Sequence, residues 1–434
     1  MRIIELTEES QNNILDNLLK RSPNNYDQYQ ETVNEILSNV KNCGDEAVFE
    51  YTKKFDKAEL SSDTLYVTQE EIDEAYELVD DELIEVMKKS IKNVKDFHEK
   101  QVRNSWITTR EDGVILGQRI TPLDNVGVYV PGGKAPLSSS VIMNIIPAKV
   151  AGVREIIMAT PPGADGKVNP STLVAANLSG ATKICKVGGA QAIAAFAYGT
   201  ESIPKVDKIT GPGNIFVALA KKTVYGNVGI DSIAGPSEIM ILADETANPR
   251  YVAADLLSQA EHDELASAIL VTTSRELAEK VLEQVEKFTA KLSRKDIITK
   301  SIENYGYILL TDSLKEAIDV VNEIASEHLE ILTKNPFDTM TRVKNAGAIF
   351  LGEYSSEPLG DYFAGPNHVL PTNGTAKFFS PLSVDDFIKK SSVISYSKEA
   401  LEEAHEDIIR FAKAEQLTAH ANSIAVRFGK EVFE

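Results

Sequence analysis

Apolar residues recur along this chain with two different periods. Short apolar runs rich in Val and Ile are typical of buried strands, and apolar residues spaced three or four apart are typical of amphipathic helices. From Asn125 onward, each short run is followed by a loop and a helical stretch, in two successive sets. The expected strands are 126–130, 155–159, 183–187 and 206–209 in the first set, and 238–242, 268–272, 306–310 and 347–351 in the second. This alternation predicts parallel sheets in an α/β fold.

The two ends of the chain differ from this pattern. The first hundred residues predict amphipathic helices, for example over 32–40 and 80–100, and we expect His98 to lie at the surface. After Pro381 the chain is expected to turn helical again, with a short helical domain over 398–428. The prediction is therefore α/β, with two Rossmann-like α/β domains and additional small helical N- and C-terminal segments. The expected parts are a segment 1–24, a discontinuous first α/β domain 25–128 plus 236–381, a second α/β domain 129–235 and a C-terminal helical domain 382–434.

Composition narrows the class of protein. The 434 residues carry 45 Lys and Arg against 65 Asp and Glu, a net charge of -20. Such a surface repels phosphate backbones, so we expect no nucleic acid and no anionic membrane as partner. Neither an export signal nor an apolar run of bilayer length is visible. Cys43 and Cys185 are too few for a disulfide framework, and a reducing cytoplasm is the expected location.

Three glycine-rich turns follow expected strands, at 131–136, 188–191 and 211–214. Glycine lets a backbone approach a ligand closely, and a helix that begins behind such a turn favours anions. None of the turns has the Gly-x-Gly-x-x-Gly spacing, so tight turns without a ligand stay an open interpretation. Ser237, in the sharp loop 234–238, is interpreted as a substrate contact, because no base partners it as a nucleophile.

The chain has only six histidines, and several of them stand beside acids or amides. Gln259 and His262 are three positions apart at the end of an apolar helical run, a spacing that directs both side chains to one helix face, as a pair of metal ligands requires. A pair of exposed polar residues at a helix end is the alternative. Glu327 is followed directly by His328, and His368 and His420 lie further along the chain.

Four long motifs, in the same order, give the chain a family resemblance. The motifs are IDSIAGPSE at 230–238, DLLSQAEH at 255–262, SEH at 326–328 and GDYFAGPNHVLPT at 360–372. Together they resemble the histidinol dehydrogenase family, most clearly from Asn125 to His420. The resemblance implies a homodimeric enzyme with one zinc per subunit that oxidises L-histidinol to L-histidine, via bound histidinaldehyde, with two successive hydride transfers to NAD in the last step of histidine biosynthesis.

The same resemblance implies roles for individual residues. It implies that Glu327 and His328 are the acid–base pair. It also implies that the C-terminal helical domain reaches the partner subunit, so that the active sites are shared. The implied zinc ligands are Gln259, His262, Asp361 and His420, which also contact substrate together with His328, and the further substrate contacts are Ser237, His368 and Glu415. The implied NAD contacts are Tyr129, Gln191 and Asn214.

These residue types suit that chemistry. Two imidazoles, a carboxylate and a carboxamide are donors that zinc accepts. An imidazole can take the alcohol proton as hydride leaves, and a carboxylate can activate water for the aldehyde step. Two other functions stay open from the residues alone: an NAD-dependent dehydrogenase of another small amino or sulfo alcohol, and a zinc hydrolase or a binding module with a structural zinc. His368 and Glu415 favour histidinol, and the glycine turns argue against the hydrolase.

Overall fold

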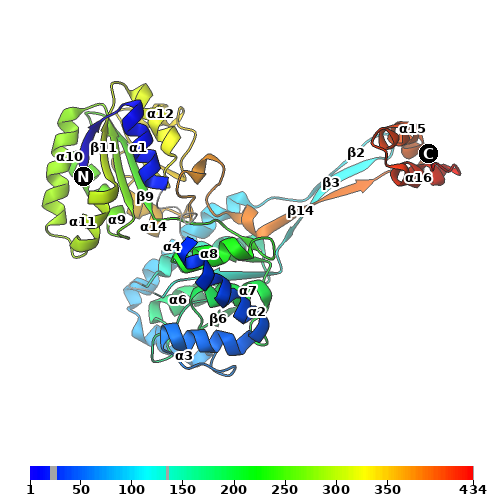
Figure 1. The fold of residues 1–434 in the computed structure, drawn as a ribbon, viewed down its shortest axis with the longest axis horizontal. Coiled ribbons are helices and arrows are strands. Elements are labelled where there is room, and N and C mark those ends of the chain that lie inside the picture. The colour runs from blue at the N-terminus through cyan, green and yellow to red at the C-terminus, as the bar shows by residue number, and fades with distance from the viewer. Residues whose placement is uncertain (20–26, 133–135, 434) are drawn as a thin grey trace. The chain divides into compact units, whose positions relative to one another are not determined.

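A computed structural model describes residues 1–19, 27–132 and 136–433, and its ribbon is drawn in Figure 1. The chain forms two compact units. Unit 1 comprises Met1–Val102 and Leu123–Phe387, and unit 2 comprises Arg103–Pro122 and Ile388–Glu434. Two segments expected from the sequence lie partly outside the described residues: the glycine turn at 131–136 and the N-terminal segment 1–24. Within the described part of the chain, no helix is both long enough and apolar enough to cross a bilayer.

The first sheet of unit 1 has five parallel strands in the order β6-β5-β4-β7-β8. Buried apolar clusters occupy both of its faces, as expected for a parallel sheet that helices cover on two sides. The strands are β4 (Asn125–Tyr129), β5 (Glu155–Ala159), β6 (Lys183–Cys185), β7 (Lys208–Thr210) and β8 (Gly229–Ile230). The helices that pack around it are α2 (Asp27–Asp56), α3 (Gln69–Leu78), α4 (Asp81–His98), α5 (Ser138–Ala151), α6 (Pro170–Ser179), α7 (Gly189–Tyr198) and α8 (Ile215–Val224).

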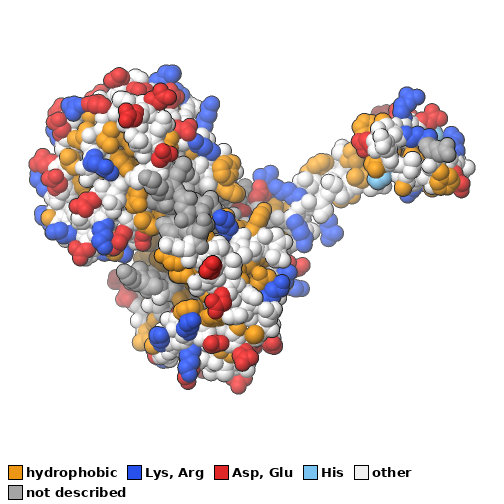
Figure 2. All heavy atoms as spheres, in the orientation of Figure 1, with side chains coloured by type: hydrophobic (Ala, Val, Ile, Leu, Met, Phe, Trp, Pro, Cys, Tyr) orange, Lys and Arg blue, Asp and Glu red, His pale blue; other side chains and the backbone are white. Residues whose placement is uncertain are grey.

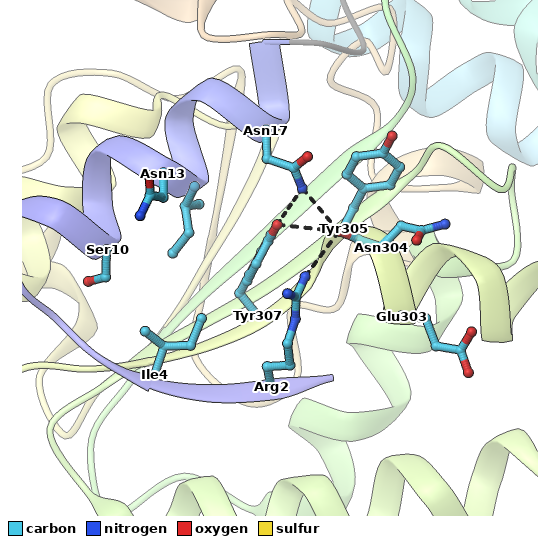
Figure 3. A pocket seen from close by; sticks show the side chains of 10 residues that line it. Arg2, Ile4, Ser10, Asn13, Asn17, Glu303, Asn304, Tyr305 and Tyr307 are labelled. Atoms are coloured by element: carbon cyan, nitrogen blue, oxygen red, sulfur yellow. Dashed lines mark hydrogen bonds between the residues drawn. The ribbon is translucent and has the colours of Figure 1, made fainter.

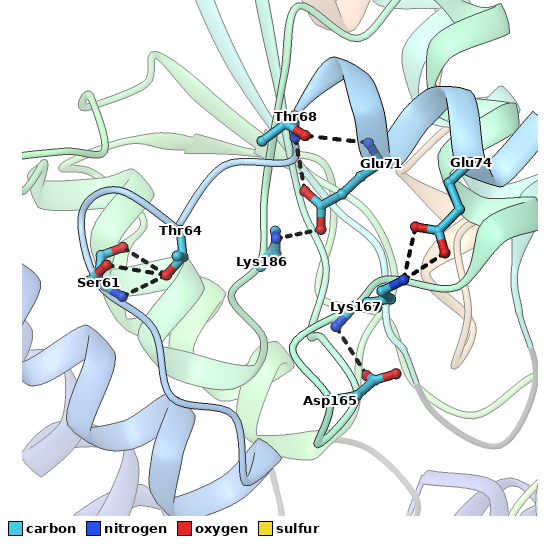
Figure 4. Close-up of polar contacts among 8 residues, drawn as sticks. All are labelled: Ser61, Thr64, Thr68, Glu71, Glu74, Asp165, Lys167 and Lys186. Atoms are coloured by element: carbon cyan, nitrogen blue, oxygen red, sulfur yellow. Dashed lines mark hydrogen bonds and ion pairs between the residues drawn. The ribbon is translucent and has the colours of Figure 1, made fainter.

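Polar contacts fix the amphipathic helix α3 to this sheet (Figure 4). Thr68 accepts from the backbone N–H of Glu71, and the Glu71 carboxylate accepts from the N–H of Thr68, which forms a capping box. The buried Lys186, which follows β6, donates to the same Glu71 carboxylate at 2.6 Å. Lys167 pairs with Glu74 one turn further along α3. The start of α3 is therefore held both by its own cap and by the sheet.

The second sheet of unit 1 has six parallel strands in the order β1-β11-β10-β9-β12-β13. Apolar clusters again fill both faces. The strands are β1 (Arg2–Glu5), β9 (Glu238–Ala243), β10 (Ser267–Thr272), β11 (Gly306–Leu310), β12 (His328–Leu332) and β13 (Ala348–Leu351). The helices of this part are α1 (Glu8–Leu19), α9 (Pro249–Ala260), α10 (Arg275–Thr289), α11 (Lys295–Tyr305), α12 (Leu314–Ile324), α13 (Pro336–Met340) and α14 (Glu357–Tyr362).

A cavity of about 710 Å³ lies beside β1, lined by residues of β1, α1, α11 and β11. Figure 3 shows the Asn17 amide directed at the Tyr307 hydroxyl and at the backbone of Asn304, to which Arg2 also donates. These hydrogen bonds fasten the N-terminal strand and helix to the edge of the six-stranded sheet. None of the lining residues is a site residue predicted from the sequence.

Unit 2 is built on an antiparallel sheet with the order β14-β3-β2, formed by β2 (Trp106–Thr109), β3 (Ile115–Pro122) and β14 (Ile388–Ser395). The helices α15 (Lys398–Ala414) and α16 (Thr418–Ala425) follow it. The expectation that the chain is helical after Pro381 is therefore wrong for 388–395. This stretch pairs along its whole length with β3, and no residue of it is fully buried, so it lacks the alternation of apolar and polar residues that marks a strand in a sequence.

The predicted fold class, α/β with parallel sheets, is confirmed. The expected domain boundaries stay a prediction. The expectation that His98 lies at the surface is wrong, because this residue is fully buried. Its Nδ1 donates to the carbonyl of Val94, and the amide of Asn367, which comes from a distant part of the sequence, lies 3.4 Å from its Nε2.

Candidate active site

Glu327 and His328 lie where β12 begins, at the amino edge of the six-stranded sheet. The neighbouring strand β9 begins at Glu238, and its Ile239 is in register with His328. The backbone N–H of Glu238 donates to Oε2 of Glu327 at 2.8 Å, and Nδ1 of His328 donates to the carbonyl oxygen of Glu238 at 3.0 Å. The peptide groups of one residue therefore orient both side chains.

Burial sets the protonation of this pair. The His328 side chain is almost fully buried, and burial lowers its pKa to about 4. Because Nδ1 donates its proton to Glu238, Nε2 carries the free lone pair, and it is buried without a hydrogen-bond partner among the described residues. Burial also raises the pKa of Glu327 well above its usual range. The arrangement presents a neutral imidazole and a carboxyl with raised proton affinity, side by side.

Asp361, on α14, lies among imidazoles. Its Oδ1 is 3.4 Å from Nδ1 of His368 and 3.9 Å from Nε2 of His328. Burial alone would raise the pKa of Asp361, but the hydrogen bond from His368 and the neighbouring imidazoles of His368, His328 and His262 outweigh it and lower that pKa. Asp361 is thus an ionised buried carboxylate, the form that binds a metal ion.

Gln259 and His262 lie at the end of α9, and His262 is close to the Asp361 carboxylate. The helix ends at Ala260, so Gln259 is on its last turn and His262 in the turn that follows, where its N–H lies 3.2 Å from the Gln259 carbonyl. The amide oxygen of Gln259 is buried without a partner among the described residues. Donor atoms of His262, Glu357 and Asp361 lie within 4.8 Å of one another.

Glu357 is a member of this group that sequence reasoning missed. It accepts from the Ser258 hydroxyl at 2.9 Å, and its own backbone N–H donates to the buried carboxylate of Glu330. Burial, followed by the charge of Asp361, raises the pKa of Glu357 to about 8. A signal was available, because Glu357 and Asp361 are four positions apart, which places two acids on one face of a helix.

His368 and Ser237 lie at the ends of two segments that meet at this edge of the sheet. Nδ1 of His368 donates to the carbonyl of Asp361 at 3.1 Å, and its Nε2 lies 3.4 Å from the Ser140 hydroxyl of α5. Ser237 is half-buried and directly precedes β9. The loop of Ser237 is attached to the segment after His368, because Gly235 donates to Thr372.

A second group lies at the carboxyl edge of the five-stranded sheet. Tyr129 ends β4, and its buried hydroxyl accepts from the N–H of Gly189 at 3.1 Å; burial raises its pKa to about 12. Gln191, on the first turn of α7, is buried, and neither polar atom of its amide has a partner among the described residues. Asn214 caps α8 through its side-chain oxygen. Tyr129, Gln191 and Asn214 thus lie at the carboxyl ends of β4, β6 and β7.

The order of these strands marks a place for a ligand. From β4, the chain proceeds through β5 to β6 on one side of the sheet, and β7 and β8 lie on the other side. The connections therefore reverse direction between β4 and β7. In open α/β sheets, ligands bind outside the carboxyl ends of the strands at such a switch point.

Glu415 and His420 fold with unit 2, in the C-cap of α15 and in α16, and both are exposed. The described donor atoms that group around Asp361 come from residues of unit 1. The donors that unit 1 does supply fit a zinc ion: an ionised carboxylate, an imidazole and an amide oxygen that is buried without a protein partner. A buried amide oxygen without a partner is costly unless a ligand occupies its lone pairs.

Comparisons with known proteins agree on one family. The profile described as histidinol dehydrogenase matches residues 19–428. The chain is 60% identical over 397 residues to a histidinol dehydrogenase of Clostridium acetobutylicum, with 92% of each chain covered. It is 59% identical over 405 residues to that of Halalkalibacterium halodurans, with 93% of this chain and 95% of the relative covered. A crystal structure of histidinol dehydrogenase from Elizabethkingia anophelis matches with a TM-score of 0.93 and 40% identity, over 99% of this chain and 98% of the other.

Proposed function

Because the chain belongs to the histidinol dehydrogenase family, we propose that it oxidises L-histidinol to L-histidine with zinc bound and with two molecules of NAD as successive hydride acceptors. The enzyme would act in histidine biosynthesis. The single observation that supports this chemistry best is the buried pair Glu327–His328, held by the peptide of Glu238 beside an ionised Asp361.

In this proposal Gln259, His262 and Asp361 hold zinc, together with His420 of the partner subunit. When bound, zinc would fix the substrate through its amine and imidazole nitrogens. Glu357 is close enough to join the ligands or to orient Asp361, since its carboxylate shares their site. Ser237, His368 and Glu415 are proposed as substrate contacts.

His328 is proposed to accept the proton of the alcohol. Its Nε2 has a free lone pair, and its Nδ1 is anchored, so the ring is held in the tautomer that a base requires. The first oxidation breaks one C–H and one O–H bond of the alcohol. The hydride leaves for NAD, which would serve as the hydride acceptor, and the proton goes to Nε2 of His328. The product is the aldehyde, retained by the protein.

Glu327 is proposed to activate water for the second oxidation. A carboxylate of raised pKa is a stronger base than one in water, and burial raises the pKa of Glu327. Its carboxylate takes one proton from water as the oxygen bonds to the aldehyde carbon. The protonated His328 returns the alcohol proton to the former carbonyl oxygen, which completes the hydrate. The neutral imidazole then removes the proton of one hydrate hydroxyl as the second hydride leaves for NAD, and the carboxylic acid that forms loses its proton to solvent.

The NAD site is proposed at the carboxyl edge of the five-stranded sheet, with contacts from Tyr129, Gln191 and Asn214. The switch in strand order supports this place, as does the buried amide of Gln191, whose polar atoms lack a protein partner. The first turns of α7 and α8 point backbone N–H groups toward the same edge, where a phosphate group would be favoured.

A homodimer with shared sites is proposed as the active form. Unit 2 carries several large apolar side chains that are mostly exposed, among them Ile107, Ile394 and Phe411, each 68–72% exposed. Figure 2 shows hydrophobic side chains on the surface of this unit. Exposed apolar groups of this size favour association with another chain.

The experiment that tests the proposed function is an absorbance assay for NADH. Purified protein with zinc, L-histidinol and NAD should form two NADH for each histidine produced. Removal of the metal by a chelator, verified by metal analysis, should abolish turnover, and added zinc should restore it. Full turnover by protein shown to be free of metal would refute the zinc assignment, and NADH formed only from another alcohol would refute the substrate.

A further inference from the structure

A buried ion pair is hydrogen-bonded to the turn that follows β7. Gly211 follows this strand directly, and its N–H donates to Oδ2 of Asp231 at 2.8 Å, while its carbonyl accepts from Nζ of Lys221 at 2.9 Å. Lys221 and Asp231 also form an ion pair with each other, and their side chains are only 3% and 5% exposed. Both polar groups of one glycine are thus held by a charged pair removed from water.

The pair joins three elements to this turn. Lys221 lies on α8 and reaches back to the turn from which its own helix begins. Asp231 follows β8, its N–H donates to the carbonyl of Ile209, and its other carboxylate oxygen accepts from the N–H of Ser232. Loss of either charge would leave the other one buried without its counter-ion, which is strongly unfavourable.

The turn itself leaves no room for a side chain at Gly211. Gly211 has φ +116°, a conformation that residues with a side chain rarely adopt, and a Cβ atom there would lie 1.9 Å from the carbonyl oxygen of Tyr129. The turn therefore packs directly against the end of β4. Three residues further on, Asn214 caps α8. Any shift of Gly211 would move both the Asn214 cap and the backbone beside Tyr129.

We propose that Lys221 and Asp231 are positioning residues for the dinucleotide cofactor: they fix the Gly211–Asn214 turn so that it accepts NAD at the switch point between β4 and β7. This inference rests on the proposed function, since it requires that NAD binds at this edge. Neither side chain touches the cofactor in the proposal. They act through the peptide groups of Gly211.

A matched control exists at the opposite end of the same strand. Lys208 begins β7, and its Nζ donates to the carbonyl and to the carboxylate of Asp386, at 2.7 and 3.1 Å. The Asp386 carboxylate accepts a backbone N–H, from Ser383, just as Asp231 accepts one from Gly211. Both pairs therefore fasten β7 by the same chemistry, but only the pair of Lys221 and Asp231 lies at the carboxyl edge.

The test compares two double variants, Lys221→Met with Asp231→Asn and Lys208→Met with Asp386→Asn, each checked for native circular dichroism. The dissociation constant of NADH, followed by its fluorescence, and KM for NAD should both rise about tenfold in the first variant, because a displaced turn weakens binding before chemistry begins. KM for histidinol should change less than about twofold in either variant, and the second variant should bind NADH like the wild type.

A merely structural role would lower the melting temperature of both variants and leave the affinity for NADH unchanged, and that result overturns the proposal. An equal rise of KM for NAD and for histidinol overturns it as well. Should the first variant not fold, Lys221→Arg, which keeps a positive charge beside Asp231 but alters the contact with the Gly211 carbonyl, is expected to raise KM for NAD about threefold. Absence of NADH binding by the wild type would instead refute the cofactor assignment itself, so the two failures are distinct.

Discussion

Glu238 orients two side chains of the candidate active site through its backbone. Its N–H and carbonyl engage Glu327 and His328, and its carboxylate accepts from the N–H of Asn373, which fastens the start of β9 from a third side. Two side chains of different chemistry therefore share one rigid anchor. A change at either of them leaves the anchor of the other in place, so the roles of the two can be separated by mutation.

Glu327→Gln should slow the oxidation of supplied histidinaldehyde by roughly a hundredfold and slow the oxidation of the alcohol far less. The reason is that an amide cannot accept a proton from water. His328→Ala should impair both steps, since the imidazole takes a proton in each. Single-turnover measurements of NADH formation from each substrate check this. Equal losses of both steps in Glu327→Gln, in protein with native circular dichroism, would contradict the division of labour.

Asp56, the last residue of α2, gives a prediction about stability and pH. One of its carboxylate oxygens is buried without a partner among the described residues, and burial raises its pKa to about 6, against about 3.9 in an unfolded chain. Between about pH 4 and pH 6, Asp56 is therefore still protonated in the folded state but already ionised in the unfolded state. The stability that this proton provides is present below about pH 4 and is lost as the pH rises through 6.

Asp56→Asn, which stays neutral, should consequently raise the melting temperature relative to the wild type at pH 7.5, and the difference should shrink toward zero at pH 4. Thermal unfolding of both proteins without cofactor at the two pH values is the measurement. A difference that is the same at both values would show that Asp56 is ionised or protonated alike in the folded and unfolded chain.

At the scale of elements, the cap of α3 offers a direct measurement of local stability. Thr68→Ala removes the hydroxyl that accepts from the Glu71 N–H, and it should lower the free energy of unfolding by about 1 kcal/mol. Ser61→Ala is the control, because that hydroxyl lies in the preceding turn and caps no helix; it should change the free energy by less than about 0.5 kcal/mol. Urea titrations with equal losses for both variants would argue against the capping box.

The element that matters most to the site is β12. It carries His328 at its first position, pairs with β9 on one side and β13 on the other, and all five of its residues are buried. Because β12 is hydrogen-bonded on both sides, its backbone holds Glu327 and His328 at a defined place on the edge of the sheet. The same logic holds at β7, whose two ends are fastened by different ion pairs.

For the whole molecule, the decisive question is which chain supplies His420. If the partner subunit supplies it, His420→Ala and His328→Ala, each inactive alone, should complement each other when unfolded and refolded together. Equal mixing gives about half mixed dimers, each with one intact site of two, so about a quarter of wild-type activity is expected. No recovery, despite mixed dimers demonstrated by native mass spectrometry, would place His420 in the site of its own chain.

The sequence by itself determined most strands of the two parallel sheets. Runs such as 155–159 and 306–310 became β5 and β11 with the expected bounds, because a strand buried on both faces is usually apolar at most of its positions. The family motifs in the sequence also singled out Glu327, His328 and Asp361, since chemistry requires particular residue types. These properties are local, so they can be recognised without knowing any partner.

Tertiary structure alone decided what depends on distant partners. β12 was not expected as a strand, because its charged and polar residues His328 and Glu330 interrupt the apolar run, and only pairing with β9 and β13 buries them. His98 is buried and lies against Asn367, which belongs to a distant part of the sequence. The pairing of Lys221 with Asp231 follows from the convergence of α8 and β8 at the end of β7. Burial and hydrogen bonding depend on two segments that meet in the fold. The pattern of residues along one segment does not show which other segment it will contact.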